Sequence, residues 1–148
     1  MKRVLVCDDD RGIRELLRVT LEDEYEVVFA SNGREAYDAI FQDRSIAGVV
    51  LDVMMPEMDG FEVLRRVRTE PATLDMAIVM LTARVAEDDY LHGYRYGADA
   101  YLSKPFDPEE LLVALREVLA RTPQQRAKIR NAEASKAALL RQLDRRPD

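Results

Sequence analysis

Residues 48–60 read GVVLDVMMPEMDG, and this stretch decides how the chain folds. An apolar run ends at Asp52, and a turn that contains proline and glycine follows at once. A carboxylate at the end of a hydrophobic strand is costly to bury, so we expect it to have a functional purpose. Three other apolar runs also end in polar groups: residues 4–7 lead into Asp8-Asp9-Asp10, residues 77–81 into Thr82, and residues 101–103 into Lys104-Pro105.

The apolar runs predict five strands, near residues 3–7, 25–29, 47–51, 77–81 and 100–103. Most are continuous stretches of valine, leucine and isoleucine, which is typical of parallel strands covered on both faces. Five helical patterns alternate with them. The first helix has an apolar stripe from Ile13 to Leu21, and the last has Asp107 as a cap followed by Pro108. The fourth helix, near residues 86–96, has the weakest pattern.

This alternation predicts an α/β fold with three layers, built on a doubly wound, five-stranded parallel sheet. Of the two common strand orders, five strands favour the flavodoxin-like order 2-1-3-4-5. Ligands then bind at the carboxyl edge, where strands 1 and 3 diverge. The second strand would lie at an edge of the sheet, and it ends in the uncharged residues 30–33. The polar strand ends thus agree with the predicted topology.

Composition indicates a single folded unit in which charge is unevenly distributed. The chain has 148 residues, of which 47% are apolar and 34% charged, with a net charge of −6 that disfavours broad nucleic-acid binding. Residues 122–148 hold seven Lys or Arg and three Asp or Glu, a net charge of +4, which leaves −10 on residues 1–121. The single Cys7 suits a reducing compartment, no apolar stretch is long enough to span a bilayer, and Met1-Lys2-Arg3 is not a signal-peptide start. We therefore expect a cytoplasmic protein.

The predicted edge of the sheet gathers groups suited to a divalent cation and a phosphoryl group. Asp8, Asp9 and Asp52 would repel one another unless they were protonated or bridged by a cation. Their hard oxygen ligands suit Mg²⁺ or Mn²⁺. An aspartate beside such a cation is an oxygen nucleophile that can form an acyl phosphate. Lys104 could offset phosphoryl charge and Thr82 could donate a hydrogen bond.

Taken together, these segments resemble the receiver domain of bacterial two-component response regulators. The resemblance covers about residues 2–121. It is carried by four segments in order: residues 4–10 (VLVCDDD), 52–60 (DVMMPEMDG), 81–84 (LTAR) and 97–106 (GADAYLSKPF). Each segment alone would be weak, but their order and their places at strand ends are specific.

The resemblance implies that Asp52 accepts a phosphoryl group from a phosphohistidine on a sensor histidine kinase. It implies Mg²⁺ binding by the side chains of Asp9 and Asp52 and the backbone carbonyl of Met54, with Asp8 acting largely through water. The reactions would be limited to the domain's own phosphorylation and dephosphorylation, so the protein would not be an enzyme in the usual sense.

The resemblance also implies how the phosphoryl group is read and lost. Thr82 and Lys104 would contact it, and the Lys104–Pro105 bond would be cis. Tyr101 occupies the aromatic switch position and would turn inward when Thr82 moves. Met54 and Arg84 occupy the positions that modulate the lifetime of the acyl phosphate. The fourth helix, fifth strand and fifth helix would form the output surface for a downstream protein, an output domain or a second copy.

Several alternatives remain open on the residues alone. Asp8 and Asp9 could cap the first helix, although Asp10 is the better cap, and Tyr101 could be a core aromatic. A Mg²⁺-dependent phosphohydrolase would use an aspartate nucleophile too. Such an enzyme usually has a second aspartate two residues further on, where this chain has Met54, and a cap domain, for which no insertion is long enough. A receiver that works without phosphate is disfavoured by the full set of site residues.

Residues 122–148 predict a basic helical extension after a receiver domain at 1–121. Thr122-Pro123 interrupts the preceding helix, and good helix formers follow. Its apolar positions have a 3-4-3-4 spacing too short for a firm coiled-coil prediction. They are Ile129, Ala132, Lys136, Leu139 and Leu143, with lysine as the poor position. The helix could lead to an absent output domain, serve dimerisation or partner binding, or have no role.

Overall fold

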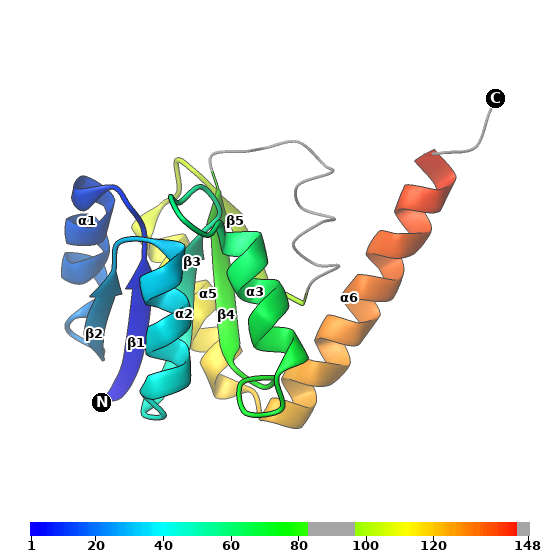
Figure 1. Ribbon diagram of the computed structural model, residues 1–148, viewed down its shortest axis with the longest axis horizontal. Coiled ribbons are helices and arrows are strands. Elements are labelled where there is room, and N and C mark those ends of the chain that lie inside the picture. The colour runs from blue at the N-terminus through cyan, green and yellow to red at the C-terminus, as the bar shows by residue number, and fades with distance from the viewer. Residues whose placement is uncertain (83–96, 145–148) are drawn as a thin grey trace.

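The computed structural model describes residues 1–82 and 97–144 (Figure 1). The predicted helix near residues 86–96, together with Arg84 and His92, lies outside these described residues. The strands are β1 Lys2–Cys7, β2 Tyr25–Ala30, β3 Ile46–Asp52, β4 Ala77–Thr82 and β5 Ala100–Ser103. The helices are α1 Arg11–Leu21, α2 Gly33–Gln42, α3 Gly60–Thr69, α5 Pro108–Ala120 and α6 Pro123–Asp144.

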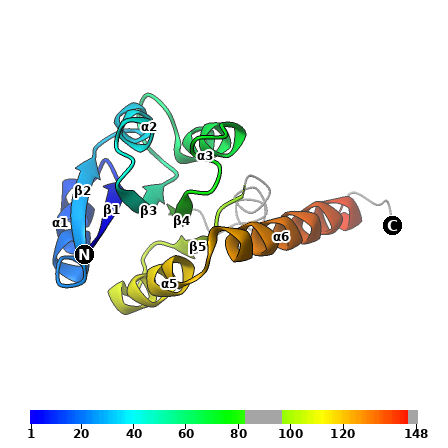
Figure 2. The same ribbon diagram turned by 90° about the horizontal axis from the view of Figure 1, so that it is seen from below.

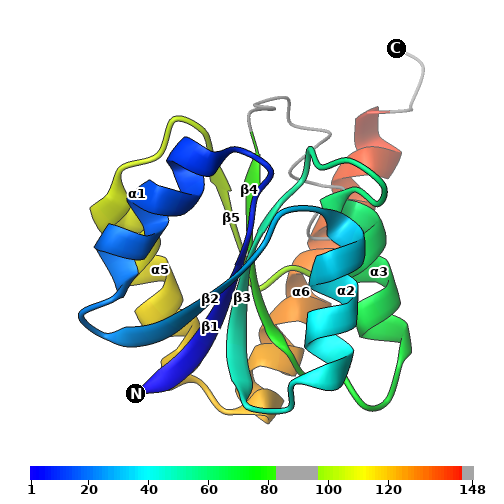
Figure 3. The same ribbon diagram turned by 60° about the vertical axis from the view of Figure 1, so that its left-hand side comes forward.

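The five strands form one parallel sheet in the order β2-β1-β3-β4-β5, which confirms the predicted topology. Helices α1 and α5 cover one face and α2 and α3 the other (Figure 3). Each face has its own core. Leu115 of α5 packs with Val4 and Val6 of β1 on one side, while Leu64 of α3 packs with Leu5 and Val49 on the other. None of the helices in the described part of the chain is long and apolar enough to cross a bilayer.

Short polar side chains cap three of the helices, and the sequence predicts two of these caps, Asp10 and Asp107. Asp10 accepts hydrogen bonds from two amides in the first turn of α1, and Asn32 accepts one from Glu35 in α2. Asp107 caps α5 in the same way. Each cap satisfies an amide that would otherwise lack a partner within the helix. Three of the helices therefore start immediately beyond the carboxyl edge of the sheet, which fixes the loops around that edge.

Helix α6 is attached to the body of the domain by arginine side chains. Arg126 donates to the backbone oxygens of Arg121 and Asp75, at 2.7 and 3.0 Å. Arg130 is buried and donates to one carboxylate oxygen of Asp99 at 2.9 Å. Further along the same face of α6, Ala137 is also buried. Figure 2 shows the helix running from the β5 side of the sheet away from α5.

The other oxygen of Asp99 accepts from Arg68 of α3 and from the backbone amide of Ile78, each at 2.9 Å. Arg68 also donates to the backbone oxygens of Gly97, Leu74 and Met76. One buried carboxylate thus joins α3, β4 and α6. The apolar positions predicted for the tail do not lie on this packed face of α6, because Ile129, Leu139 and Leu143 are exposed. Sequence periodicity identified the free face of α6, whereas ion pairs hold the packed face.

We expect Asp99→Asn to destabilise the protein more than Arg130→Gln. Loss of the carboxylate charge leaves two buried guanidinium groups without their nearest counter-ion, which costs about 3–5 kcal/mol in comparable pairs, and among the described residues Arg130 keeps only the exposed Asp75 at 4.0 Å. Loss of Arg130 leaves Asp99 paired with Arg68, so we expect about 1–3 kcal/mol. Urea unfolding measures both changes.

The exposed pair between Arg116 and Glu24 offers a control. Arg116→Gln should change the free energy of unfolding by less than about 1 kcal/mol. Equal effects of Asp99→Asn and Arg116→Gln would show that the buried ion pairs do not hold α6.

Candidate functional site

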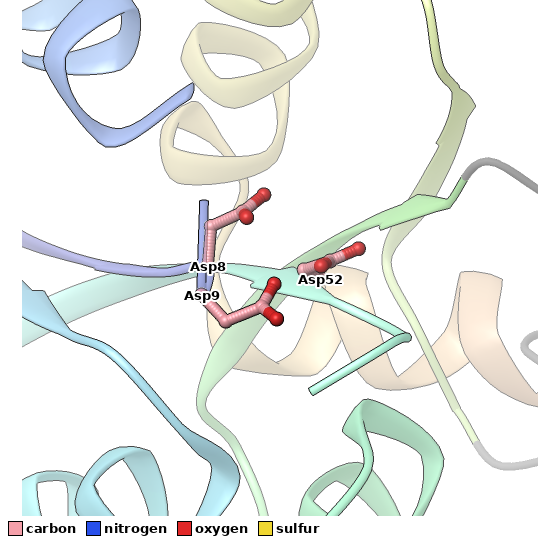
Figure 4. Close-up of side chains that lie close together, drawn as sticks. All are labelled: Asp8, Asp9 and Asp52. Atoms are coloured by element: carbon pink, nitrogen blue, oxygen red, sulfur yellow. The ribbon is translucent and has the colours of Figure 1, made fainter. Parts of the chain in front are cut away.

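Three carboxylates converge at the carboxyl edge of the sheet, as the sequence predicts (Figure 4). Asp8 and Asp9 follow β1, and Asp52 ends β3, the neighbouring strand. Each offers an oxygen within 4.8 Å of those offered by the other two. Asp8 and Asp52 are only 1% and 2% exposed, whereas Asp9 is exposed. The arrangement forms an acidic pocket with two buried walls and one side open to solvent.

Lys104 closes the pocket from the β5 side. Its Nζ lies 2.8 Å from Asp8 Oδ2 and 3.3 Å from Asp52 Oδ1. Its backbone N–H donates to the Thr82 carbonyl oxygen at 2.6 Å, which ties the loop after β5 to the end of β4. The Lys104–Pro105 bond is cis, as the resemblance implied. The structure thus brings the ammonium between two carboxylates that are 44 residues apart in sequence.

The negative charge in this pocket exceeds what one ammonium can offset. Burial, and after it the nearby Asp8 charge, raise the pKa of Asp52 to about 6. Lys104 and the Met54 backbone amide act in the opposite direction but only partly compensate. Burial would lower the pKa of Lys104, yet its hydrogen bond to Asp8 and the charge of Asp52 outweigh this and raise it. Hard oxygen donors with excess negative charge fit a small divalent cation.

Two glycines determine the path of the loop after Asp52. A Cβ atom at Gly60 would lie 2.3 Å from the Asp52 carbonyl oxygen, and one at Gly33 would lie 1.7 Å from the Met58 carbonyl oxygen. Asp59 caps α3. Residues 59–60 thus supply the start of α3, and Gly60 in addition packs against the backbone of Asp52. The sequence signal for this close approach is a glycine eight residues after Asp52. A single glycine is too common to indicate such a contact by itself.

The remaining predicted residues lie on β4, β5 and the loop after β3. Thr82 ends β4, fully buried, and pairs in register with Ser103 of β5. The Tyr101 ring is buried, nearly parallel to the Phe61 ring with centroids 6.5 Å apart. It is therefore already turned inward in this structure. Met54 is half exposed in the loop that follows Asp52.

Two supports of Asp8 were not anticipated. The Asp10 amide donates to Asp8 Oδ1 at 2.9 Å, and Arg14 donates to the Asp8 carbonyl oxygen at 2.8 Å. Both belong to the start of α1, so the helix that Asp10 caps also orients the carboxylate. Cys7, directly before Asp8, is buried, and burial raises its pKa, which makes the thiol unreactive.

The fold and the pocket define a class: α/β signalling domains that carry an acidic aspartate cluster, a threonine and a lysine at the carboxyl edge of a 2-1-3-4-5 sheet. Comparison with known proteins gives the family. The family model described as the response regulator receiver domain matches residues 4–116. The chain belongs to this family, the phosphorylation-dependent switches of two-component signalling.

Relatives in the family include named regulators. The chain is 50% identical over 121 residues to the response regulator MprA of Mycolicibacterium vanbaalenii, covering 81% of this chain and 51% of MprA. It is 42% identical over 122 residues to the phosphate regulon transcriptional regulatory protein PhoB of Pseudomonas aeruginosa, covering 82% and 53%. The chain therefore spans about half the length of these curated relatives.

Solved structures show the same fold. The chemotaxis protein CheY4 of Vibrio cholerae is 39% identical, with a TM-score of 0.73 over 80% of this chain and 98% of CheY4. The Francisella response regulator 1452 receiver domain is 29% identical, with a TM-score of 0.76 over 82% of this chain and 98% of that domain.

We expect Asp52→Asn to stabilise the metal-free protein at pH 7. A raised pKa in the folded state means that ionisation of Asp52 opposes folding. This loss of stability grows as the pH rises from about 4, the unfolded pKa, to about 6, and stays constant above. Asp52→Asn removes the ionisable group, so it should increase the free energy of unfolding by about 2–3 kcal/mol at pH 7 and by almost nothing at pH 4. Thermal unfolding in a chelating buffer at both pH values measures the difference.

Magnesium supplies the complementary measurement. Mg²⁺ should raise the melting temperature of the wild-type protein at pH 7, and it should raise that of Asp52→Asn much less. If Asp52→Asn is less stable than the wild-type protein at pH 7 without metal, the buried Asp52 charge does not destabilise the fold.

We expect Gly60→Ala to distort the site. The added methyl group would displace the Asp52 carbonyl and cost about 1–3 kcal/mol, typical of overpacking. Gly12→Ala is the matched control, because its Cβ would meet the movable Asp10 side chain at 3.2 Å rather than backbone. Urea unfolding and the Mg²⁺ dependence of stability should change at position 60 and remain nearly unchanged at position 12. Equal tolerance at both positions would contradict the close approach.

Proposed function

We propose that Asp52 is the phosphoacceptor of this receiver domain and that its phosphoryl group comes from a phosphohistidine on a sensor histidine kinase. The buried Asp8–Asp52 pair, which Lys104 contacts as the one cation among the described residues, carries the proposal. Asp9, Asp52 and the Met54 carbonyl would hold Mg²⁺, for which Mn²⁺ can substitute, with Asp8 acting through water. The bound cation would neutralise charge on the phosphoryl oxygens during transfer.

In the transfer, one carboxylate oxygen of Asp52 attacks phosphorus and forms a P–O bond. The P–N bond to the donor histidine breaks, and the imidazole leaves with the electron pair of that bond and takes up a proton. Lys104 keeps the attacking carboxylate ionised and faces the incoming negative charge. Hydrolysis reverses the modification: a water oxygen attacks phosphorus, the P–O bond to Asp52 breaks, and inorganic phosphate leaves.

The phosphoryl group would then compete with the carboxylate of Asp8 for the Lys104 ammonium. It brings about −1.5 to −2 charge and new acceptor oxygens, which attract Lys104 and the Thr82 hydroxyl. A shift at the end of β4 would change the surroundings of Tyr101, which we assign as the switch residue. Met54 stands half exposed at the mouth of the pocket, where it can influence the approach of water. We assign it and Arg84 to control of the phosphoryl lifetime.

In this proposal, residues 1–121 form the switch and residues 122–148 are an appended basic helix. The output acts on a downstream protein or on an output domain outside this segment, through a face that includes β5 and α5. The net charge of −10 on residues 1–121 disfavours direct nucleic-acid binding by the receiver itself.

Intact mass spectrometry after incubation with Mg²⁺ and a small phosphodonor tests the proposal. We expect a mass gain of one phosphoryl group in the wild-type chain and none in Asp52→Ala or after chelation of the metal. Lys104→Met should slow the gain by about 10²-fold or more, because the charge that faces the phosphoryl oxygens is lost. Arg116→Gln, at an exposed pair remote from the pocket, should react like wild type.

Two outcomes would contradict this assignment. Phosphorylation that persists in Asp52→Ala would place the acceptor elsewhere. Steady turnover of a phosphate ester, without accumulation of phosphoprotein, would instead favour the alternative, a Mg²⁺-dependent phosphohydrolase.

A further inference from the structure

A shallow groove of about 390 Å³ runs between β5 and α5, apart from the acidic pocket. Its floor is apolar and is formed by Leu102 of β5 with Val113 and Ala114 of α5. Val113 is 43% exposed, unusual for a valine on a helix that otherwise buries its apolar face. The rim is entirely acidic, consisting of Asp107, Glu109, Glu110 and Glu117. The groove thus fits a partner that combines apolar and basic side chains.

Glu110 and Glu117 are the available charges of this rim. Asp107 caps α5, and Glu109 lies 4.0 Å from Arg116. Neither Glu110 nor Glu117 forms an ion pair with a residue in the described ranges 1–82 and 97–144. The two are seven residues apart, so they lie on one face of α5, about 10 Å apart along its axis. A ligand on the apolar floor would meet one carboxylate near each end.

Helix α6 of the same chain has the opposite combination. Ile129, Leu139 and Leu143 are 36%, 56% and 46% exposed, and with Ala132 they form one exposed stripe. Two exposed lysines accompany this stripe: Lys136 lies within it and Lys128 lies at its edge, about 12 Å apart along the axis. The α6 stripe is therefore apolar with two cations, where the groove is apolar with two anions.

The attachment of α6 fixes the direction in which this stripe faces. Arg126 and Arg130 hold the opposite part of the helix against Asp75 and Asp99. The α6 stripe lies roughly 130° around the helix axis from that packed face, at 3.6 residues per turn. In Figures 1 and 2 the helix runs away from α5, and the described residues that line the groove belong to β5, to the turn before α5 and to α5. The stripe of a chain does not reach its own groove.

We propose that the occupant of the groove is the α6 stripe of a second copy of this chain. Two copies related by a twofold axis would each insert their stripe into the groove of the other, so the contact forms twice and closes. Each insertion covers leucine and isoleucine side chains that are now exposed, and it places Lys128 and Lys136 near Glu110 and Glu117. This assembly uses α5, β5 and α6, and it does not require phosphorylation of Asp52.

Analytical ultracentrifugation of the full chain over a concentration series tests the proposal. We expect self-association that weakens as the salt concentration rises. Leu139→Glu on the stripe and Val113→Glu in the groove should each weaken it at least about tenfold, a change of about 1.4 kcal/mol. Gln142→Glu is the control: it adds the same charge at an exposed position of α6 outside both faces, and association should stay unchanged.

Mixing and charge exchange separate this arrangement from a coiled coil between two α6 helices. Leu139→Glu chains retain an intact groove and Val113→Glu chains an intact stripe, so the mixture should form heterodimers through one contact. A chain with Lys128→Glu and Lys136→Glu alone should associate more weakly, because acidic side chains then face the acidic rim. Adding Glu110→Lys and Glu117→Lys to that chain should restore association. Wild-type association of Val113→Glu would overturn the proposal in favour of the coiled coil, and a monomeric wild-type chain would overturn it entirely.

The substituted positions are exposed, so the variants should fold, and far-ultraviolet circular dichroism checks this. Mass gain at Asp52 with a phosphodonor is measured on the same samples. It should be unchanged in every variant, so a failure of assembly is distinguishable from a failure of the phosphoacceptor assignment.

Discussion

The repulsion between two buried carboxylates is the constraint on which the structure around the site depends. Asp8 and Asp52 lie side by side because β1 and β3 are neighbours in a parallel sheet, and within the described part of the chain the Lys104 ammonium alone lies between their charges. The backbone of Gly60 packs so closely against the Asp52 carbonyl that a Cβ at position 60 would lie 2.3 Å from its oxygen. The result is a pKa of about 6 for that residue and a pocket with excess negative charge. Such strain is useful in a site that is completed by a cation.

The opposite end of the sheet shows what the same groups do when their charges balance. The Asp99 side chain is as buried as that of Asp52, yet it meets two guanidinium groups and a backbone amide. Its oxygens are occupied by strong donors, so this cluster joins helices and has no capacity left for a ligand. Burial of an aspartate therefore does not identify a reactive site. The ratio of acidic to basic groups and the remaining hydrogen-bonding capacity distinguish the two ends.

The sequence predicts the acidic pocket well because a parallel sheet places successive strand ends at one edge. Asp8, Asp52 and Lys104 each follow an apolar run, so fold and pocket emerge from one pattern. The contacts of α6 escape this logic, because Arg130 sits on a helix whose apolar spacing points elsewhere. Its partner Asp99 precedes a short strand, where turn chemistry is the ordinary explanation. Long-range ion pairs leave no periodic trace, and neither does the approach of Gly60 to a backbone oxygen.

Strand β5 connects the two charged clusters, and this connection restricts how the proposed switch can respond. The Asp99 amide donates to the Ile78 oxygen before the strand, and the Lys104 amide donates to the Thr82 oxygen after it. Both ends of the strand are thus fixed to β4 and to a buried charge, so sliding along the sheet would break contacts at Asp99 and at Lys104 together. Side chains between the two fixed ends, such as Tyr101, can rearrange at a lower free-energy cost than the strand can slide. Because coupling between sites is reciprocal, any effect of phosphoryl binding on the Asp99 cluster implies an equal effect of α6 attachment on the affinity of the pocket.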